Sequence, residues 1–132
     1  MPIIATDYTP PFLFKNRHFN TIYSSLFRRI KPVAFKRKRL ETSDDDFLDI
    51  DFIENGSKKI VILCHGLEGS SDSKYIQATA KILSKNGYSI AALNYRFCSG
   101  EINRQLITYH SGKTDDLHTL LIMCYQIMIL FI

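Results

Sequence analysis

The sequence predicts an α/β fold in which a mixed sheet opens with antiparallel strands and continues into a βαβ unit. Three observations carry this prediction. Residues 34–42 and 46–54 resemble strands joined by a short link, 59–64 and 88–94 are apolar runs typical of buried strands, and 72–86 between these runs has helical periodicity. A helix between two strands of one sheet implies a parallel pair with a right-handed crossover.

The first 33 residues are predicted to form an arm and one helix, separate from the body. Three prolines stand among aromatic residues in 1–14, so this stretch is expected to be extended. In 16–29 the apolar residues recur at helical spacing, and Pro32 follows as a stop signal.

The strand at 46–54 alternates aliphatic residues with Asp49 and Asp51, which predicts one wet face. Turn-forming residues at 43–45 and 55–57 bound it on both sides. Because short links favour antiparallel neighbours, we expect this strand to pair with the strands before and after it in the chain.

Helix boundaries follow from capping residues. Residues 70–72 (Ser-Ser-Asp) are good N-caps for the helix at 72–86. A later helix is predicted to begin near Thr114, with Asp115 and Asp116 in its first turn, where negative charge favours the helix dipole. Residues 127–132 are compatible with helix or strand.

Charge and composition exclude several classes of protein. The 132 residues carry a net charge of +4, with nine Lys and Arg and one Asp in residues 1–40. The longest apolar run, 120–132, is shorter than the ~20 residues of a membrane-spanning helix. The first residues lack the pattern of an export signal, so a cytoplasmic protein with reduced thiols is expected. No cofactor is predicted.

The most informative segment is the strand–loop–helix at His65-Gly66-Leu67-Glu68-Gly69. A tight turn at the carboxyl end of a buried parallel strand directs backbone N–H groups into open space, beside the amino end of a helix. Such donors suit a developing oxyanion or a phosphate. A simple strand-to-helix turn is the alternative.

Three motifs in order resemble the YheT-like branch of the α/β-hydrolase superfamily. They are an HGL-x-GS turn, an Asn-x-Arg-Gly-Cys-Ser-Gly loop and a Tyr-His-Ser-Gly-x-Thr-x-Asp-Leu segment, which correspond here to His65–Ser70, Asn94–Gly100 and Tyr109–Leu117. Phe97 departs from the pattern, because the branch usually has Gly there. The helix at 16–29 is similar to the branch's amino-terminal element.

The resemblance implies the amino-terminal part of an α/β-hydrolase fold, and ester hydrolysis of a small-molecule substrate by full-length relatives. It assigns the backbone N–H of Leu67 to the oxyanion hole, with His65, Gly66, Glu68 and Gly69 in the loop near the site. The G-x-S-x-G nucleophile elbow of such enzymes is absent from the sequence, so no catalytic residue is assigned.

The resemblance also divides the chain. Residues 34–121 are expected to be a partial hydrolase core, and 122–132 an atypical apolar tail. A frameshift or early stop after about Leu121 is the expected origin, and the product is expected to be inactive alone. In the superfamily the strand at 60–64 also borders the strand leading to the elbow, so here we expect it to be an open, aggregation-prone edge.

Local alternatives are weaker. His110 and Ser111 with Asp115 or Asp116 contain the residue types of a triad, but adjacent residues rarely converge. A loop-anchoring role, with one of these aspartates capping backbone, is favoured. Ser70 and Ser71 are more plausible as caps than as nucleophiles.

Metal and nucleic-acid binding are not expected either. Cys64 is predicted to be a core side chain, and Cys98 and Cys124 with His65 lack the spacing of a zinc site. The run Lys36–Arg39 has no nucleic-acid motif and is interpreted as a solvated strand whose charges protect a sheet edge. A non-catalytic remnant or interaction module with this basic face remains the alternative function. The oligomeric state is not predicted.

Overall fold

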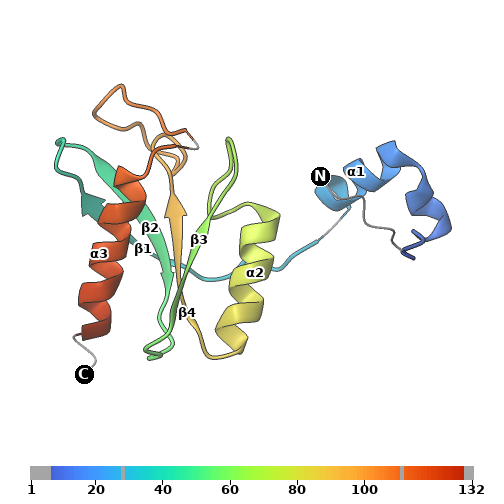
Figure 1. Ribbon diagram of the computed structural model, residues 1–132, viewed down its shortest axis with the longest axis horizontal. Helices are drawn as coiled ribbons and strands as arrows, with labels where there is room; N and C mark the ends of the chain where they lie inside the picture. The colour runs from blue at the N-terminus through green and yellow to red at the C-terminus, as the bar shows by residue number, and fades with distance from the viewer. Residues whose placement is uncertain (1–6, 28, 111, 130–132) are drawn as a thin grey trace.

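The computed structural model describes residues 7–27, 29–110 and 112–129. Four strands in this part of the chain form one mixed sheet in the order β1-β2-β4-β3 (Figure 1). The strands are β1 (Lys36–Glu41), β2 (Phe47–Ile53), β3 (Ile60–Cys64) and β4 (Ser89–Asn94). β1 and β4 both pair antiparallel with β2, and β3 runs parallel to β4. The predicted fold class is therefore confirmed.

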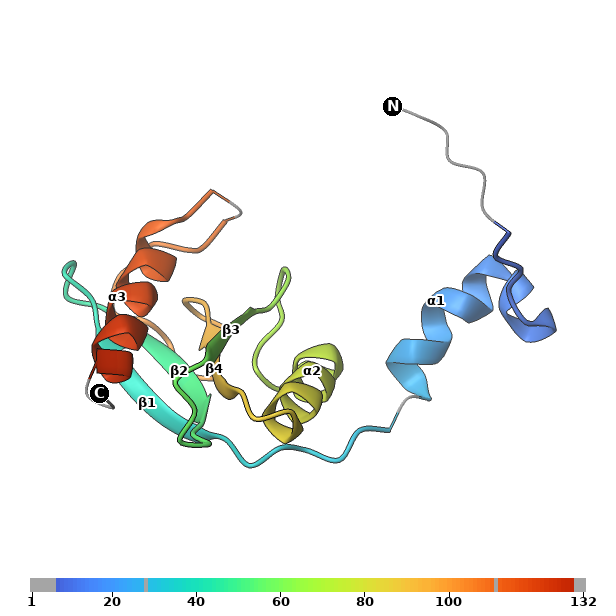
Figure 2. The same cartoon turned by 60° about the horizontal axis from the view of Figure 1, so that its bottom comes forward.

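Two helices cover opposite faces of this sheet (Figure 2). Helix α3 (Asp115–Ile129) places Leu120 and Cys124 in a core with Leu93 and the aliphatic residues of β2. Helix α2 (Lys74–Lys85) places Ile76 and Ala80 against Ile90 and other residues of β3 and β4. Because side chains alternate along β4, this one central strand supplies both cores.

The sheet order corrects one expectation. The link after β2 was expected to join antiparallel neighbours, but β4 lies between β2 and β3. The link does not close a hairpin because Asn55 donates hydrogen bonds to the carbonyls of Ser84 (2.8 Å) and Tyr88 (3.0 Å). These contacts fix it beneath the start of β4, whose residues are all buried and suit the centre of the sheet.

The predicted wet face of β2 is also wrong, since Asp49 and Asp51 are buried. In the β1–β2 register, Arg39 stands opposite Asp49 and Arg37 opposite Asp51. Each guanidinium donates two 2.8 Å hydrogen bonds to the opposite carboxylate. Asp51 also accepts hydrogen bonds from Ser71 (2.5 Å) and Asn94 (2.9 Å). The acidic face is therefore covered by cations and polar groups rather than by water.

Burial and these hydrogen bonds have opposite effects on the pKa values of Asp49 and Asp51. Burial raises the pKa of Asp51, but hydrogen bonds from Arg37 and Ser71 offset it and hold the pKa below its usual value. Asp49 behaves likewise, with Arg39 as its main partner, so its pKa is also low. Both groups are therefore ionised in the folded protein at neutral pH.

Capping differs from the prediction for the helix after β3. The N-cap of α2 is Ser73, not a residue of 70–72. Its hydroxyl accepts from Ser70 N–H (3.0 Å), and the Ser70 hydroxyl accepts from Asp72 N–H (3.1 Å). Ser71 is buried against Asp51 instead. The three polar residues thus order the turn that precedes the helix.

The two ends of the described chain are helical. Residues Phe12–Lys15 form a 3-10 turn, η1, where an extended arm was predicted, and α1 (Arg17–Leu26) follows. At the other end, α3 runs without interruption to Ile129, so 127–129 are helical. The rest of the segment that was compatible with helix or strand, residues 130–132, lies outside the described residues.

Candidate functional site

The loop after β3 is a tight turn over Gly66–Gly69. Gly69 N–H donates to the carbonyl of Gly66 at 3.0 Å, and Glu68 has a φ of 53°, the left-handed conformation that the third position of such a turn often needs. Leu67, the second residue, is 86% exposed at the tip. In the described part of the chain, its N–H has no hydrogen-bond partner.

Two tyrosines satisfy the amides on either side of Leu67. Gly66 N–H donates to the Tyr75 hydroxyl at 2.6 Å, and Glu68 N–H donates to the Tyr109 hydroxyl at 2.5 Å. The phenol oxygens come from α2 and from the long loop before α3. Sequence analysis did not identify either tyrosine as part of this site. The turn is thus held on both sides while the central amide stays open.

His65 is buried and ties the ends of β3 and β4 together. Its Nε2 accepts the backbone N–H of Tyr95 at 3.1 Å, and its Nδ1 lies 2.8 Å from the carbonyl of Gly66. An Nε2 that accepts a hydrogen bond carries no proton, so Nδ1–H is the donor to Gly66. This neutral tautomer uses both ring nitrogens, so His65 is a structural residue.

Aromatic rings form one wall of a cavity of about 430 Å³ at this turn. Tyr95 stacks on Tyr109 with ring centroids 4.9 Å apart, and both rings meet His65 edge-on. Burial raises the pKa of Tyr95 to about 12 and also raises that of Tyr109. Both phenols are therefore neutral at physiological pH. The remaining lining residues are Gly66, Leu67 and His110.

A buried ion cluster supports the loop that carries Tyr95 and Tyr109. Arg96 is almost fully buried and donates to Asp116 (2.8 and 3.1 Å), Asp46 (2.9 Å) and Asp44 (2.6 and 3.2 Å). The cluster joins the β1–β2 turn, the end of β4 and the start of α3. Asp116 therefore anchors this loop, as expected of Asp115 or Asp116, but it does so by pairing with a cation rather than by capping backbone.

The acidity of the cluster reflects these contacts. Hydrogen bonds from Arg96 and Thr42 lower the pKa of Asp44 to about 2. Burial raises the pKa of Asp46, but Asn103 and the Arg104 N–H offset it, and the net pKa is low. The carboxylates of Asp44 and Asp46 are thus ionised and held by fixed donors.

The local triad is not assembled in the described residues. His110 Nδ1 accepts the N–H of Gly112 at 3.1 Å, Asp116 is engaged by Arg96, and Asp115 lies 3.5 Å from the Lys113 ammonium. The predicted nucleophile of that alternative, Ser111, lies outside the described residues.

Phe97 has a φ of 65°, in the left-handed region that favours glycine. Its N–H donates to the Asn103 side chain at 2.7 Å, which in turn binds Asp46 at 2.9 Å. At the position where the family motif usually has Gly, this sequence therefore places a side chain in a strained backbone conformation.

The cysteines are free and differ from expectation. Cys64 is exposed rather than in the core, because it ends a strand at the open edge of the sheet. Cys124, from the predicted tail, is instead buried in the core, and burial raises the pKa of its thiol. Within the described residues, no group of His, Cys, Asp or Glu side chains has an arrangement that could hold a metal ion.

The basic strand β1 is largely neutralised within the molecule. Arg37 and Arg39 pair with β2, Arg39 also contacts Glu101 (2.8 Å), and Lys38 contacts Glu54 (2.5 Å). The charges that a basic interaction face would use are therefore already engaged. No described helix combines the length and apolar character needed to cross a bilayer.

Comparison with known proteins identifies relatives among esterases and lipases. The chain is 36% identical to the "Putative esterase YheT" of Escherichia coli over 85% of its own length and 34% of that protein's. It is 31% identical to monoacylglycerol lipase ABHD2 of Danio rerio over 71% of its length and 24% of the lipase. No protein-family model matches the sequence.

The solved structure of esterase Pf2001 from Pyrococcus furiosus has the same fold. In one crystal form the TM-score is 0.61 at 22% identity, covering 95% of this chain and 40% of the esterase. In another form the TM-score is 0.57 at 26% identity, covering 70% of this chain and 36% of the esterase.

The mixed sheet, the crossover through α2 and these matches show part of an α/β-hydrolase fold. The chain is homologous to YheT of Escherichia coli, as its three motifs predicted. It spans about a third of the length of YheT and about a quarter of the length of the lipase.

Proposed function

We propose that this chain forms one wall of the active site of a carboxylic-ester hydrolase and supplies the Leu67 N–H to its oxyanion hole. The observation that carries the proposal is the pattern of hydrogen bonds in the turn. The amides of Gly66 and Glu68 are satisfied by tyrosine hydroxyls, whereas the amide of Leu67, which lines the cavity, has no partner among the described residues.

Such a donor has a defined task in ester hydrolysis. Attack on an ester carbonyl places negative charge on its oxygen, and a fixed N–H about 2.7–3.1 Å from that oxygen stabilises the transition state. The two tyrosines and His65 hold the donor in place before substrate arrives. A group that needs no reorganisation during the reaction stabilises charge most effectively.

The remaining catalytic groups must come from outside the residues of this site. The 132 residues contain no G-x-S-x-G elbow, and His65 is occupied by Tyr95 and Gly66. The aromatic wall of Tyr95 and Tyr109 favours an ester with an apolar acyl or alcohol group. The relative named as a monoacylglycerol lipase supports a lipid-like ester as the substrate class.

The test joins this chain to the portion of E. coli YheT that the alignment does not cover and measures hydrolysis of p-nitrophenyl butyrate. In the fusion, Leu67→Pro is expected to lower kcat by about 10²–10³-fold, the usual effect of losing one oxyanion donor. Leu67 is the second residue of a turn, where proline is well tolerated, so the substitution removes the N–H and keeps the turn.

The matched control is Leu67→Ala, which shortens the side chain but keeps the N–H. We expect it to retain most of the turnover. Equal losses in the two variants would assign the effect to the side chain, and unchanged turnover in both would exclude Leu67 from the oxyanion hole. The unfused chain is expected to show no turnover above background.

A further inference from the structure

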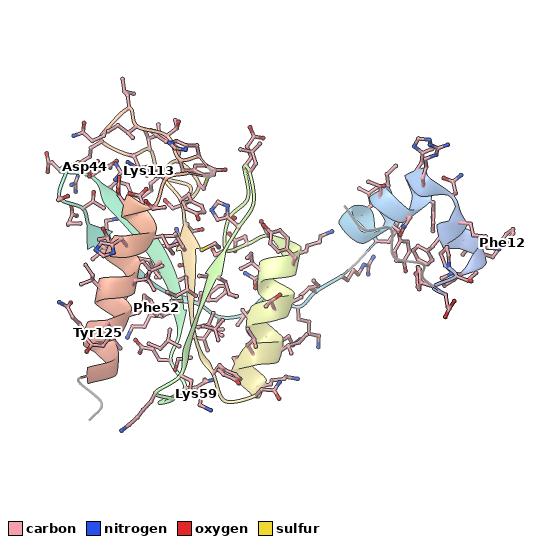
Figure 3. The ribbon with its side chains drawn as sticks, in the orientation of Figure 1. Phe12, Asp44, Phe52, Lys59, Lys113 and Tyr125 are labelled. Carbon is pink, nitrogen blue, oxygen red and sulfur yellow. The ribbon has the colours of Figure 1, made fainter. Side chains whose placement is uncertain are left out.

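The amino-terminal element, defined here as η1 and α1 together, lies apart from the sheet in both views (Figures 1 and 2). Figure 3 places Phe12 at its outer end, pointing away from the body of the molecule. None of the described side chains of α1 is buried, whereas α2 buries Ile76 and Ala80 on the sheet. The apolar face of α1 is therefore not consumed by packing on the sheet.

Large apolar side chains are exposed along this element. Phe12 is 84% exposed and Leu26 68%, and Leu13, Ile22, Tyr23 and Phe27 are also exposed. Phe12, Leu13, Phe19 and Ile22, with Asn16, line an apolar hollow of about 510 Å³. An apolar area of this kind on one short element marks a docking surface.

The element is ordered internally, which distinguishes it from a loose arm. The Asn16 side chain accepts from the N–H groups of His18 (3.0 Å) and Phe19 (3.2 Å) and so caps α1. Phe14, Phe19 and Tyr23 contact one another with ring centroids 5.0–5.6 Å apart. These rings hold η1 against α1, so the apolar hollow is preformed.

The positive charge around this element indicates what kind of partner binds its apolar surface. Residues 12–31 contain five Lys and Arg and no Asp or Glu, and two of the five, Lys15 and Arg17, lie at the junction of η1 and α1. Unlike most of the basic residues of β1, neither has an ion pair in the described part of the chain. Exposed aromatic and aliphatic side chains beside unpaired cations are typical of helices that lie in the interface of an anionic membrane.

We propose that the amino-terminal element binds the surface of an anionic lipid bilayer, with Phe12, Leu13 and Leu26 entering the interface and Lys15 and Arg17 contacting headgroups. The proposal rests on the proposed function only for the reason why such binding would be useful, since an enzyme acting on a lipid-like ester must reach a lipid surface. Binding itself needs no catalysis.

The experiment is co-sedimentation of the full 132-residue chain with vesicles of ether-linked phosphatidylcholine, with or without ether-linked phosphatidylserine. Ether lipids cannot be hydrolysed, so failure here and failure of the proposed esterase site are separate results. We expect binding to the phosphatidylserine vesicles that weakens as salt is raised, and much weaker binding to phosphatidylcholine alone.

Two variants locate the contact. Phe12→Ser with Leu13→Ser is expected to lower the partition coefficient at least tenfold, because both side chains lose apolar burial. Lys15→Glu with Arg17→Glu is expected to lower it by at least about 25-fold, or about fivefold per cation removed. All four positions are exposed, so the fold is expected to survive, which circular dichroism checks.

The matched control is Lys58→Glu with Lys59→Glu. This pair makes the same change of charge at the link before β3, and Figure 3 shows Lys59 far from Phe12. We expect the control to change binding less than the Lys15 and Arg17 variant does. No binding to phosphatidylserine vesicles, or equal losses in the two charge variants, would overturn the proposal. Retention of binding after the Phe12 and Leu13 changes would overturn it too, because the contact with the vesicle would then lie elsewhere on the molecule.

Discussion

At one edge of the sheet, β1 presents four consecutive basic residues, Lys36–Arg39, whereas at the other edge β3 presents five apolar residues, Ile60–Cys64. The charges of β1 pair with buried acids of β2 and with surrounding loops. Among the described residues, β3 pairs with β4 alone, and beside it lies a groove of about 330 Å³ lined by Ile62, Tyr125 and other apolar residues.

The two edge strands of this sheet therefore differ in how readily they can pair with another chain. Basic side chains on an edge strand discourage pairing with another chain, while an uncharged apolar edge invites it. The polar side of this sheet is therefore stabilised by buried ion pairs and is sensitive to charge. The β3 side depends on apolar packing and is sensitive to association.

The largest expected effect is on the polar side, from Arg96→Leu. Removing the guanidinium leaves Asp46 and Asp116 buried without a cation, and breaking a buried ion pair in this way costs about 3–5 kcal/mol. That loss approaches the whole stability of a small domain. Urea denaturation followed by circular dichroism measures it.

The control for that variant is Arg104→Leu, which removes an exposed pair with Glu41 and is expected to change stability little. Equal midpoints for the two variants would show that burial of the Arg96 cluster contributes nothing special.

The second largest expected effect is a loss of stability at low pH, which arises from the carboxylates on the same polar side of the sheet. The folded pKa of Asp44 is about 2, and those of Asp46, Asp49 and Asp51 are below their usual values. A group with a lowered folded pKa stabilises the protein above its unfolded pKa, near 4, and loses this contribution as the pH falls towards the folded value.

The melting temperature is therefore expected to be more than about 5 °C lower at pH 3 than at pH 6. Thermal scans by circular dichroism test this. Asp44→Asn should make the difference smaller, and a higher melting temperature at pH 3 would contradict the sign.

The apolar edge predicts a third effect, on association rather than folding. Leu121→Lys with Tyr125→Lys places two charges beside the groove at β3, and both side chains are already half exposed or more. We expect several-fold slower aggregation by light scattering, with the free energy of unfolding changed by less than about 1 kcal/mol in total.

Leu106→Lys is the matched control, because Leu106 is almost fully exposed but lies in the loop before α3. If it slows aggregation as much as the double variant does, general surface apolarity rather than the β3 edge drives association.

The smallest expected effect comes from substitutions in two turns, one on the β3 side of the sheet and one on the polar side. Glu68, after β3, and Asp45, in the β1–β2 turn, both have positive φ, at 53° and 57°. Glu68→Gly is expected to stabilise the fold by about 0.5–1 kcal/mol, because only glycine adopts this conformation without strain. Asp45→Gly is expected to gain less, since aspartate tolerates it. A larger gain at Asp45, by urea denaturation, would contradict this account.

Sequence patterns predicted the elements whose signal is local. The apolar runs of β3 and β4 identified both strands, and the helix between them required a parallel pair. Only β4 is buried along its whole length, because β3 lies at an edge of the sheet. The order of the sheet was not predictable in this way, because the anchoring of Asn55 to Ser84 and Tyr88 joins residues about 30 positions apart.

The same limit applied to buried charge. Alternation placed Asp49 and Asp51 on one face of β2, but whether that face is wet depends on what stands opposite. The Arg-x-Arg spacing of β1 matched the Asp-x-Asp spacing of β2 in antiparallel register, so a signal existed in the sequence. No such signal linked Tyr75 and Tyr109 to the turn, because they lie 9 and 41 residues from the amides they bind.

The hydrogen bond from Tyr95 N–H to His65 Nε2 gives the end of the sheet a spectroscopic marker. It requires the proton on Nδ1, so the two ring nitrogens should give distinct ¹⁵N resonances, with Nδ1 in the protonated range and Nε2 in the unprotonated range. The Tyr95 amide, protected by a side chain rather than by a ladder partner, can exchange with solvent only when the ring moves away. Its hydrogen-exchange rate would therefore report the opening of the loop beside Leu67 without any probe attached to the cavity.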